Sequence, residues 1–382
     1  EAAPGPNVVM VGPVGPDADR RWGVSKTIEL PSHTTLILQG AYLFLSDWAR
    51  CDLIQNRDYI EGNEDIHIIG RGGARLDINP SHQPQYLNHR EDEIWMEEQG
   101  MKLSDITKEV IGDMTVAEYA LQRETVPYRI CGMIFYNVTN LSLRGFIIGP
   151  MCSWPLHIER VQNVRISDCT VAQDGREPCQ EFIHVYGPAE RVVIDNIVGT
   201  CSDDICALTT SESLLSTNGW GGDKLPDKIR WENAGPIHGV VISNIIVRNL
   251  WCTGLLRVLP APGYPIDGIH ITNIQMLETP GRSLAHAVLK FGNTKSGMPR
   301  SEYMPFDPCP PEDQANITIE NVFVKDWVGP FIVVLEPVKN LTIRGVRGNH
   351  TGPLLHNYGH AIDGLTLEDC RTTLVGGPET PF

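Results

Sequence analysis

Two adjacent acidic residues, Asp203 and Asp204, are the strongest chemical signal in this sequence. They separate the alternating apolar pattern of residues 190–198 from a second strand-like run that begins at Cys206. Neighbouring carboxyl groups repel when both are ionised, so one of the two is expected to keep its proton to a higher pH than an isolated aspartate. Two carboxyl groups in different protonation states are what hydrolysis of a glycosidic bond requires. An Asp-Asp turn between two strands is the structural alternative.

A short pattern recurs along the chain and predicts the elements that position these acids. Aligned on its first apolar residue, the pattern begins at residues 141, 164, 192, 240, 269, 317, 341 and 365. Each unit is a short strand, a bend at Asn or Gly and a second short strand, with apolar residues alternating inward. A unit of about 24 residues cannot bury its inner face alone, so the units must stack. We predict an all-β fold, a right-handed, single-stranded parallel β-helix. A leucine-rich repeat would need a leucine spacing that this sequence lacks.

The repeat brings a third acid, Glu181, to the acidic pair. Glu181 lies 22 residues before Asp203, which is close to one coil of the predicted solenoid. Residues one coil apart stack on neighbouring strands about 4.8 Å apart. We therefore expect Glu181, Asp203 and Asp204 to converge on one face of the molecule.

Three segments interrupt the repeat, at residues 86–127, 211–237 and 293–314. The first has helical periodicity and a capping box that starts at Thr115, so it is predicted to be a helical insert. Long excursions on a regular scaffold often form walls, lids or subunit contacts. We expect one β-helix domain over residues 1–382, with these inserts and with 86–127 as a candidate contact in a homo-oligomer.

With these residues in place, the sequence resembles the polygalacturonase-like enzymes of glycoside hydrolase family 28. That family is a parallel β-helix with Asn-Thr-Asp, Gly-Asp-Asp, Gly-His-Gly and Arg-Ile-Lys motifs. Ser202-Asp-Asp-Ile-Cys-Ala207 resembles the second motif, and Phe182-Ile-His-Val-Tyr186 resembles the strand after the first. The resemblance implies an inverting glycoside hydrolase that acts on a pectic or uronic-acid-containing polysaccharide without a metal or cofactor. It also implies that Asp203 is the general acid and that Glu181 and Asp204 hold the attacking water.

The sequence departs from the family where the family grips its substrate. The first motif reads Cys179-Gln180-Glu181, and Ser202 replaces the Gly of the second. The third and fourth motifs align with Cys252-Thr253-Gly254 and Val288-Leu289-Lys290, which keep only the last Gly and the Lys. A substrate other than ordinary galacturonan is therefore expected.

Cationic and aromatic residues near these motifs are candidates to bind the substrate in place of the altered motif residues. Arg257 follows the third motif, while His286 and Lys290 lie on the next coil. Arg binds a carboxylate through two hydrogen bonds and Lys binds it as a point charge. Trp220 could stack on the apolar face of a sugar. We predict that Arg257, Lys290, His286 and Trp220 bind substrate; solvated side chains are the alternative.

Composition excludes some partners and favours a compartment. The formal net charge is -16, so nucleic acid is not expected as a partner. No apolar run approaches the roughly 20 residues that span a bilayer, so no membrane partner is expected. The ten cysteines form no Cys-x-x-Cys pair, and we expect mostly buried thiols with one to three disulfides. The chain begins at Glu1 rather than Met, as after removal of a leader, and we expect a secreted or periplasmic protein.

Two other functions are compatible with these residues. A polysaccharide lyase or epimerase on the same fold would use a Lys or Arg base, or acids that bind Ca²⁺ to neutralise a uronate. A non-catalytic carbohydrate-binding solenoid would need no catalytic acids. Ultraviolet absorbance of the product separates a lyase from a hydrolase, and the binding protein would release no reducing sugar.

Overall fold

The computed structural model of the 382-residue chain describes residues 7–13, 21–47, 49, 51–80, 131–151, 154–175, 180–210, 235–250, 254–278, 287–292, 309–327, 329–350, 352–357, 362–374 and 379–381. The predicted inserts fall largely or wholly outside these residues. The helical insert at 86–127 is outside them, and so are most of 211–237 and of 293–314.

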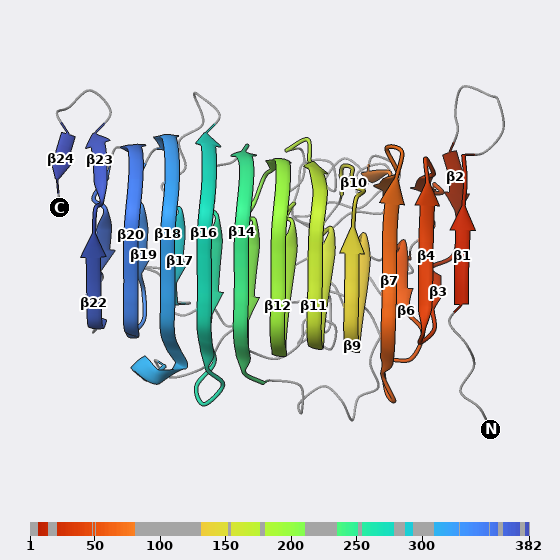
Figure 1. Ribbon diagram of the computed structural model, residues 1–382, viewed down its shortest axis with the longest axis horizontal. Helices are drawn as coiled ribbons and strands as arrows, with labels where there is room; N and C mark the ends of the chain where they lie inside the picture. Colours follow the sequence, from red (N-terminus) through yellow and green to blue (C-terminus); the bar gives the residue numbers. More distant parts are fainter. Residues whose placement is uncertain are drawn as a thin grey trace, which may run out of the picture.

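The described chain winds into a stack of coils, and each complete coil contributes strand segments to three parallel faces (Figure 1). The first face contains short strands. They are β3 (Ile28–Leu30), β6 (Ile54–Asn56), β13 (Cys206–Thr209), β15 (Leu256–Leu259), β17 (Leu289–Phe291), β19 (Ile332–Val334) and β21 (Leu355–Asn357).

Longer strands bend from one face to the next. They are β9 (Met133–Arg144), β11 (Leu156–Ala172), β12 (Ile183–Cys201), β14 (Ile237–Asn249), β16 (Ile266–Glu278), β18 (Gln314–Trp327) and β20 (Val338–His350). The beginnings of β9, β11 and β12 complete the first face.

Shorter strands complete the second and third faces. On the second face they are β1 (Asn7–Val11), β4 (Thr34–Gln39), β7 (Asn63–Arg71) and β22 (Ile362–Glu368). On the third face they are β2 (Arg21–Val24), β5 (Tyr42–Leu45), β8 (Arg75–Asp77), β10 (Ile147–Ile148), β23 (Arg371–Leu374) and β24 (Glu379–Pro381). A 3₁₀ turn, η4 (Pro311–Asp313), precedes β18, and β24 pairs antiparallel with β23.

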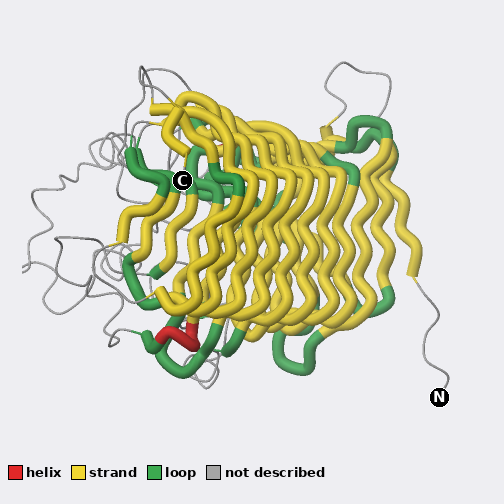
Figure 2. The backbone as a smooth tube through the Cα atoms, turned by 60° about the vertical axis from the view of Figure 1, so that its left-hand side comes forward, coloured by secondary structure: helices red, strands yellow, loops and turns green. Residues whose placement is uncertain are grey.

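The strand register confirms the repeat predicted from sequence. The eight starting residues of the sequence repeat lie opposite one another, coil after coil, on the second face. They are Leu141, Val164, Val192, Val240, Ile269, Ile317, Leu341 and Leu365. All the strand pairs that join these residues are parallel, so the predicted parallel β-helix is confirmed. Figure 2 shows the same zigzag repeated from coil to coil.

The core is a set of apolar rows inside the coil. The inward residues of the second face are at most 2% exposed from Val164 and Ile166 through Ile317 and Ile319. Val and Ile dominate these rows because β-branched side chains pack well on a pleated surface. The predicted burial is confirmed for these residues, whereas Leu365 of the last coil is 38% exposed.

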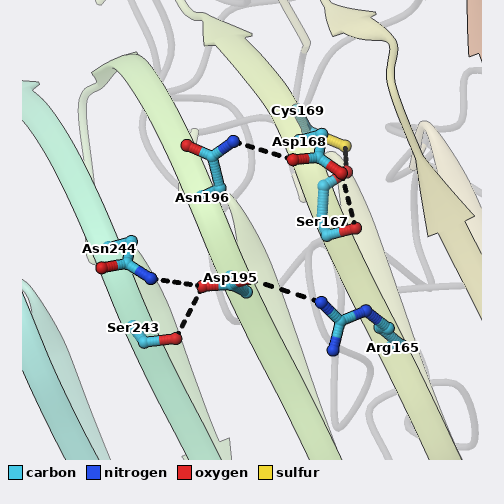
Figure 3. A network of polar contacts seen from close by, with 8 residues as sticks. All are labelled: Arg165, Ser167, Asp168, Cys169, Asp195, Asn196, Ser243 and Asn244. Carbon is cyan, nitrogen blue, oxygen red and sulfur yellow. Dashed lines mark hydrogen bonds and ion pairs between the residues drawn. The ribbon is translucent and has the colours of Figure 1, made fainter.

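Polar side chains link the coils at the bend between the second and third faces (Figure 3). Asn196 and Asn244 have φ near +55°, a conformation that Asn tolerates better than most residues. Asn196 Nδ2 donates to Asp168 Oδ1 of the preceding coil, at 2.7 Å. Asn244 Nδ2 and Ser243 Oγ both donate to Asp195 Oδ1, at 2.7 and 2.8 Å. We call the hydrogen-bonded row of Asp168, Asp195, Asn196, Ser243 and Asn244 the ladder bend.

In the part of the chain that the structure describes, no helix is long and apolar enough to cross a membrane.

Candidate active site

The three acids lie in turns that lead from the third face into the first face. Asp203 and Asp204 lie between Cys201, the last residue of β12, and Cys206, the first of β13. Glu181 lies two residues before β12 begins.

The register of β12 and β13 brings the two acid-bearing turns together. Ile183 pairs with Cys206 in parallel, so Glu181 and the acidic pair each lie within four residues before matching points of successive coils. The Ser202 backbone N–H donates to the Gln180 carbonyl oxygen at 3.1 Å and joins the two turns directly. The three acids therefore lie on one side of the molecule.

Hydrogen bonds hold the turn that carries the acidic pair. The Asp204 backbone N–H donates to Asp203 Oδ1 at 2.9 Å. Asn249 Nδ2 donates to the carbonyl oxygens of Asp203 and Gly254, at 3.0 and 3.1 Å. One amide group therefore ties the acidic turn to the turn of the next coil.

The side chain of Gln180 connects the acidic turn to the preceding coil. Its Nε2 donates to the Met151 carbonyl oxygen at 2.7 Å, and its Oε1 accepts from the Gly175 N–H at 3.0 Å and from Ser202 Oγ at 3.2 Å. Gln180 precedes Glu181 and Ser202 precedes Asp203. The side chain of Gln180 thus connects the two segments that carry the acids.

Burial distinguishes the three carboxyl groups. Glu181 is 4% exposed and Asp204 is 1% exposed, whereas Asp203 is partly exposed. Burial raises the pKa of Asp204 from 3.8 to about 6, and the Asp203 charge adds to this rise. The charges of Lys290 and Arg257 oppose it. The resemblance implied that Asp204 stays ionised, whereas its enclosure raises its pKa and favours the protonated form below about pH 6.

The enclosure of Asp204 depends on a glycine of the next coil. A Cβ atom at Gly254 would lie 2.6 Å from Asp204 Oδ1, so a side chain at position 254 would displace the carboxyl group. The φ of Gly254 is +153°, which also favours glycine. Asp204 Oδ1 is buried without a hydrogen-bond partner among the described residues. An orphaned carboxylate oxygen of this kind is energetically unfavourable and is often found where a ligand or catalysis uses it.

Arg257 and Lys290 follow the acids along the first face. Arg257 of β15 pairs with Ala207 of β13 on one side and with Lys290 of β17 on the other. Both cations are half-buried, they lie on the two strands that follow β13, and the charge of each lowers the pKa of Asp204. The structure therefore brings two of the four predicted substrate-binding residues to the acids. The other two, His286 and Trp220, lie outside the described residues.

Sequence reasoning missed the contact between His184 and Glu181. His184 Nδ1 lies 2.7 Å from Glu181 Oε1, and its Nε2 lies 2.9 Å from Thr209 Oγ1. His184 alternates with apolar neighbours, a pattern that predicts an outward strand residue with a structural role. Its pairing with Ala207 does place it outward, but its side chain is buried. The spacing of Glu181 and His184, three residues apart across the start of a strand, was the signal available.

An aromatic cluster covers the first face on the N-terminal side of the acids. The Trp154 ring stacks on His157 with centroids 5.4 Å apart and meets the edge of His184 at 4.5 Å. His157 Nε2 lies 3.2 Å from Glu159 Oε2, and neither side chain is exposed. The side chains of His157 and Glu159 on this part of the first face are inaccessible to solvent, whereas those of Arg257 and Lys290 are partly accessible.

Two buried thiols flank the acidic pair. Burial raises the pKa of Cys201 and of Cys206 well above 9, so neither forms the thiolate that a nucleophile requires. Cys201, Cys206, Cys169 and Cys370 are buried and carry no disulfide. The expectation of buried thiols is confirmed for these four, and the chemistry of the site rests on its carboxyl groups.

The chain resembles solved structures at low sequence identity. The endo-xylogalacturonan hydrolase from Aspergillus tubingensis is 10% identical over 97% of this chain and 94% of that chain, with a TM-score of 0.51. A family 28 exopolygalacturonase from Yersinia enterocolitica is 13% identical over 99% and 74% of the two chains, with a TM-score of 0.48. A surface protein and adhesin of Streptococcus pneumoniae is 11% identical over 95% and 91%, with a TM-score of 0.44.

These similarities are similarities of fold. The chain shares the fold of the Aspergillus hydrolase. No protein family model and no curated protein matches the sequence.

Proposed function

We propose that this protein is a glycoside hydrolase, a divergent relative of the polygalacturonases, that cleaves a uronic-acid-containing polysaccharide or oligosaccharide by an inverting mechanism. The observation that carries the proposal is that Glu181 and the Asp203–Asp204 pair lie in the turns that enter two paired strands, with Arg257 and Lys290 on the strands that follow. Neighbouring carboxyl groups that can take separate acid and base roles are what this chemistry needs. The shared fold supports the proposal only by analogy.

The three acids have separate roles in this proposal. Asp203 is the proton donor, because it is the partly exposed carboxyl and can reach the leaving oxygen of a sugar. Glu181 and Asp204 orient and deprotonate the attacking water. Inversion needs room for that water between the acid and the base, a separation of about 6.5–9.5 Å between carboxyl groups.

Arg257 and Lys290 supply the specificity for a charged substrate. They are adjacent in register on the strands that follow the acids. The protein has a net charge of -16, so an anionic glycan needs such a local positive site to bind. The family's third and fourth motifs are altered here, and we infer that the preferred substrate differs from plain galacturonan. Carbohydrate is then the principal partner, and the described β-helix acts as one domain outside the cell.

Release of reducing ends from a panel of glycans tests the proposal. The panel contains galacturonan, xylogalacturonan, alginate and a neutral arabinan, each with the wild-type protein and with Asp203→Asn. We expect release from at least one uronic-acid-containing glycan by the wild type and a strong loss in the variant. The anomer first formed, observed by NMR, should be inverted. Absence of reducing ends from every glycan would contradict the proposal.

A lyase or epimerase is the second candidate, because Arg257 and Lys290 lie beside the acids and could neutralise a uronate. A lyase leaves an unsaturated product that absorbs ultraviolet light, and an epimerase changes the sugar without cleavage. Product absorbance and the NMR spectrum of the treated glycan identify either reaction in the same panel. Glycan binding without any change would indicate a carbohydrate-binding solenoid.

A further inference from the structure

A buried chain of three side chains runs from the acids into the first face. Glu181 Oε1 lies 2.7 Å from His184 Nδ1, and His184 Nε2 lies 2.9 Å from Thr209 Oγ1. Glu181 is 4% exposed, His184 is 6% exposed and Thr209 is not exposed. The three residues come from two successive coils, because β12 carries His184 and β13 carries Thr209.

The order carboxylate, imidazole and hydroxyl is also the order of a nucleophilic triad. In such a triad the hydroxyl attacks the substrate and must be accessible to it. Thr209 is fully buried, so its hydroxyl cannot perform that attack. Glu181 belongs to the acid cluster, and so this end of the chain is the one at the proposed site. The hydroxyl therefore serves as an anchor for the imidazole.

The ring of His184 is held on several sides. Tyr186 stacks on it with centroids 4.5 Å apart and an interplanar angle of 24°. Trp154 meets it edge-on, also at 4.5 Å. With the ring plane fixed by these contacts and the rotation fixed by Thr209, Nδ1 has one direction in which to donate, and Glu181 occupies it.

We propose that His184 is a positioning residue that orients the Glu181 carboxylate, with Thr209 as its anchor. The Nδ1–H donates to Glu181, and the Thr209 hydroxyl donates to Nε2. The inference rests on the proposed function, in which Glu181 orients the attacking water. A glutamate has one more rotatable bond than an aspartate, so its carboxylate needs an additional restraint to stay in one position. His184 supplies that restraint.

Kinetics of four variants test the positioning role. His184→Phe keeps an aromatic ring in the stack but removes the donor, and we expect kcat to fall about 10- to 100-fold, as for other supporting residues of a site. KM should change little. Thr209→Val removes the anchor and should lower kcat about fivefold, the effect of one neutral hydrogen bond. Thr209→Ser retains the hydroxyl and should recover most of that loss.

The matched control is His157→Phe. His157 lies one coil away in the same aromatic cluster and its partner is Glu159 rather than Glu181. Thermal denaturation of both His→Phe variants reports damage to the cluster. We expect similar changes in stability and a large loss of kcat only for His184→Phe. Equal losses of kcat in the two variants would overturn the proposal.

A double variant separates positioning from general damage. If His184 acts through Glu181, then His184→Phe combined with Glu181→Gln should be no slower than Glu181→Gln alone. Losses that multiply would show that His184 acts independently of Glu181 and would overturn the proposal.

NMR of protein with ¹⁵N-labelled histidine tests the same contacts without any substrate. The His184 signals, assigned by their loss in His184→Phe, should show a proton on Nδ1. The Nδ1 proton should be lost or strongly shifted in Glu181→Gln and the Nε2 signal shifted in Thr209→Val, whereas His157→Phe, whose ring lies 6.2 Å from that of His184, should keep the Nδ1 proton. Signals unaffected by the first two substitutions would overturn the inference. A wild-type protein that is inactive on every glycan would contradict the proposed function while this measurement still decides the contact.

Discussion

Asp195 and Asp204 lie at two different bends of the β-helix, and their surroundings shift the pKa of their carboxyl groups in opposite directions. At the ladder bend, Asp195 accepts hydrogen bonds from Ser243 and Asn244 of the next coil, and these bonds lower its pKa. At the turn that leads into the first face, Asp204 is buried, and burial raises its pKa to about 6. The first arrangement satisfies the carboxylate and the second isolates it.

The difference shows where this fold gives stability and where it gives reactivity. A hydrogen bond repeated from coil to coil is favourable at each step and is part of what holds the stack together. An enclosed carboxyl group destabilises the folded state when it is ionised, and such groups cluster at functional sites. Substitutions at the two edges should therefore have effects of opposite kind.

The largest expected effect is on catalysis at the acidic edge. Asp203→Asn cannot donate a proton to the leaving oxygen, and we expect kcat on a natural glycan to fall about a thousandfold. An aryl glycoside, if the enzyme accepts one, should be affected less because its leaving group needs little protonation. Rates on both substrates provide the measurement, and Asp195→Asn at the ladder bend is the control that should remain active. An equal loss on both substrates would remove Asp203 from the donor role.

The second effect is on stability, and its sign should differ between the edges. The pKa of Asp204 is 3.8 in the absence of the fold and about 6 in it. The folded state therefore binds the proton more tightly, and stability is lost as the pH rises through about 6. Asp204→Asn removes the ionised group and should raise the free energy of unfolding at pH 7 by up to about 3 kcal/mol. Urea denaturation at pH 7 and pH 4 measures this gain, which should shrink at the lower pH.

Asp195→Asn provides the matched comparison for Asp204→Asn. The pKa of Asp195 is lowered, so its contribution to stability is present above the usual aspartate pKa and is lost as the pH falls. The substitution should lower the free energy of unfolding at pH 7 by about 1 kcal/mol, the value of a typical hydrogen bond. A stabilising Asp195→Asn or a destabilising Asp204→Asn would break the contrast between the two edges.

A third prediction concerns the pH dependence of the reaction. Asp204 must be ionised to activate water in the proposed mechanism, and its pKa is about 6. We expect the acid limb of the kcat/KM profile to rise as the pH increases through about 6, with a decline on the alkaline side because the donor must keep its proton. A profile with no such acid limb, and a fall through about pH 6 in its place, would assign the donor role to Asp204.

The smallest expected effect is on substrate binding. Arg257→Ala and Lys290→Ala each remove a charge beside the acids, and each should raise KM for a uronic-acid-containing glycan about tenfold with little change in kcat. Either substitution should also raise the pKa of Asp204, since both cations lower it. A neutral glycan is the control, and an equal rise in KM for that glycan would indicate that the cations do not select for charge.

The fold could be predicted from the sequence to the level of single residues. The alignment of Leu141, Val164 and Val192 by their place in the repeat matches their register in the structure. This succeeded because the inward row of a solenoid imposes the same apolar pattern on every coil.

The candidate site could be predicted only in part. The repeat predicts which strands carry the acids and two of the cations, but it does not predict how the turns between those strands place each carboxyl group. The burial of Asp204 depends on Gly254, which is distant in the sequence and approaches only after the next coil has formed. The contact of His184 with Glu181 likewise follows from a turn geometry that a strand pattern does not encode. The roles of His286 and Trp220 remain predictions.

The parallel stacking also sets how such a site can change. Glu181, Asp204 and Gly254 occupy equivalent points of successive coils, and so do Arg257 and Lys290. Separations along this row therefore come in increments of one strand spacing, about 4.8 Å. Inserting one coil between the paired strands β13 and β15 would shift the cations by one increment relative to the acids without changing any of these residues. The position at which a charged sugar sits relative to the cleaved bond is thus adjustable in discrete steps.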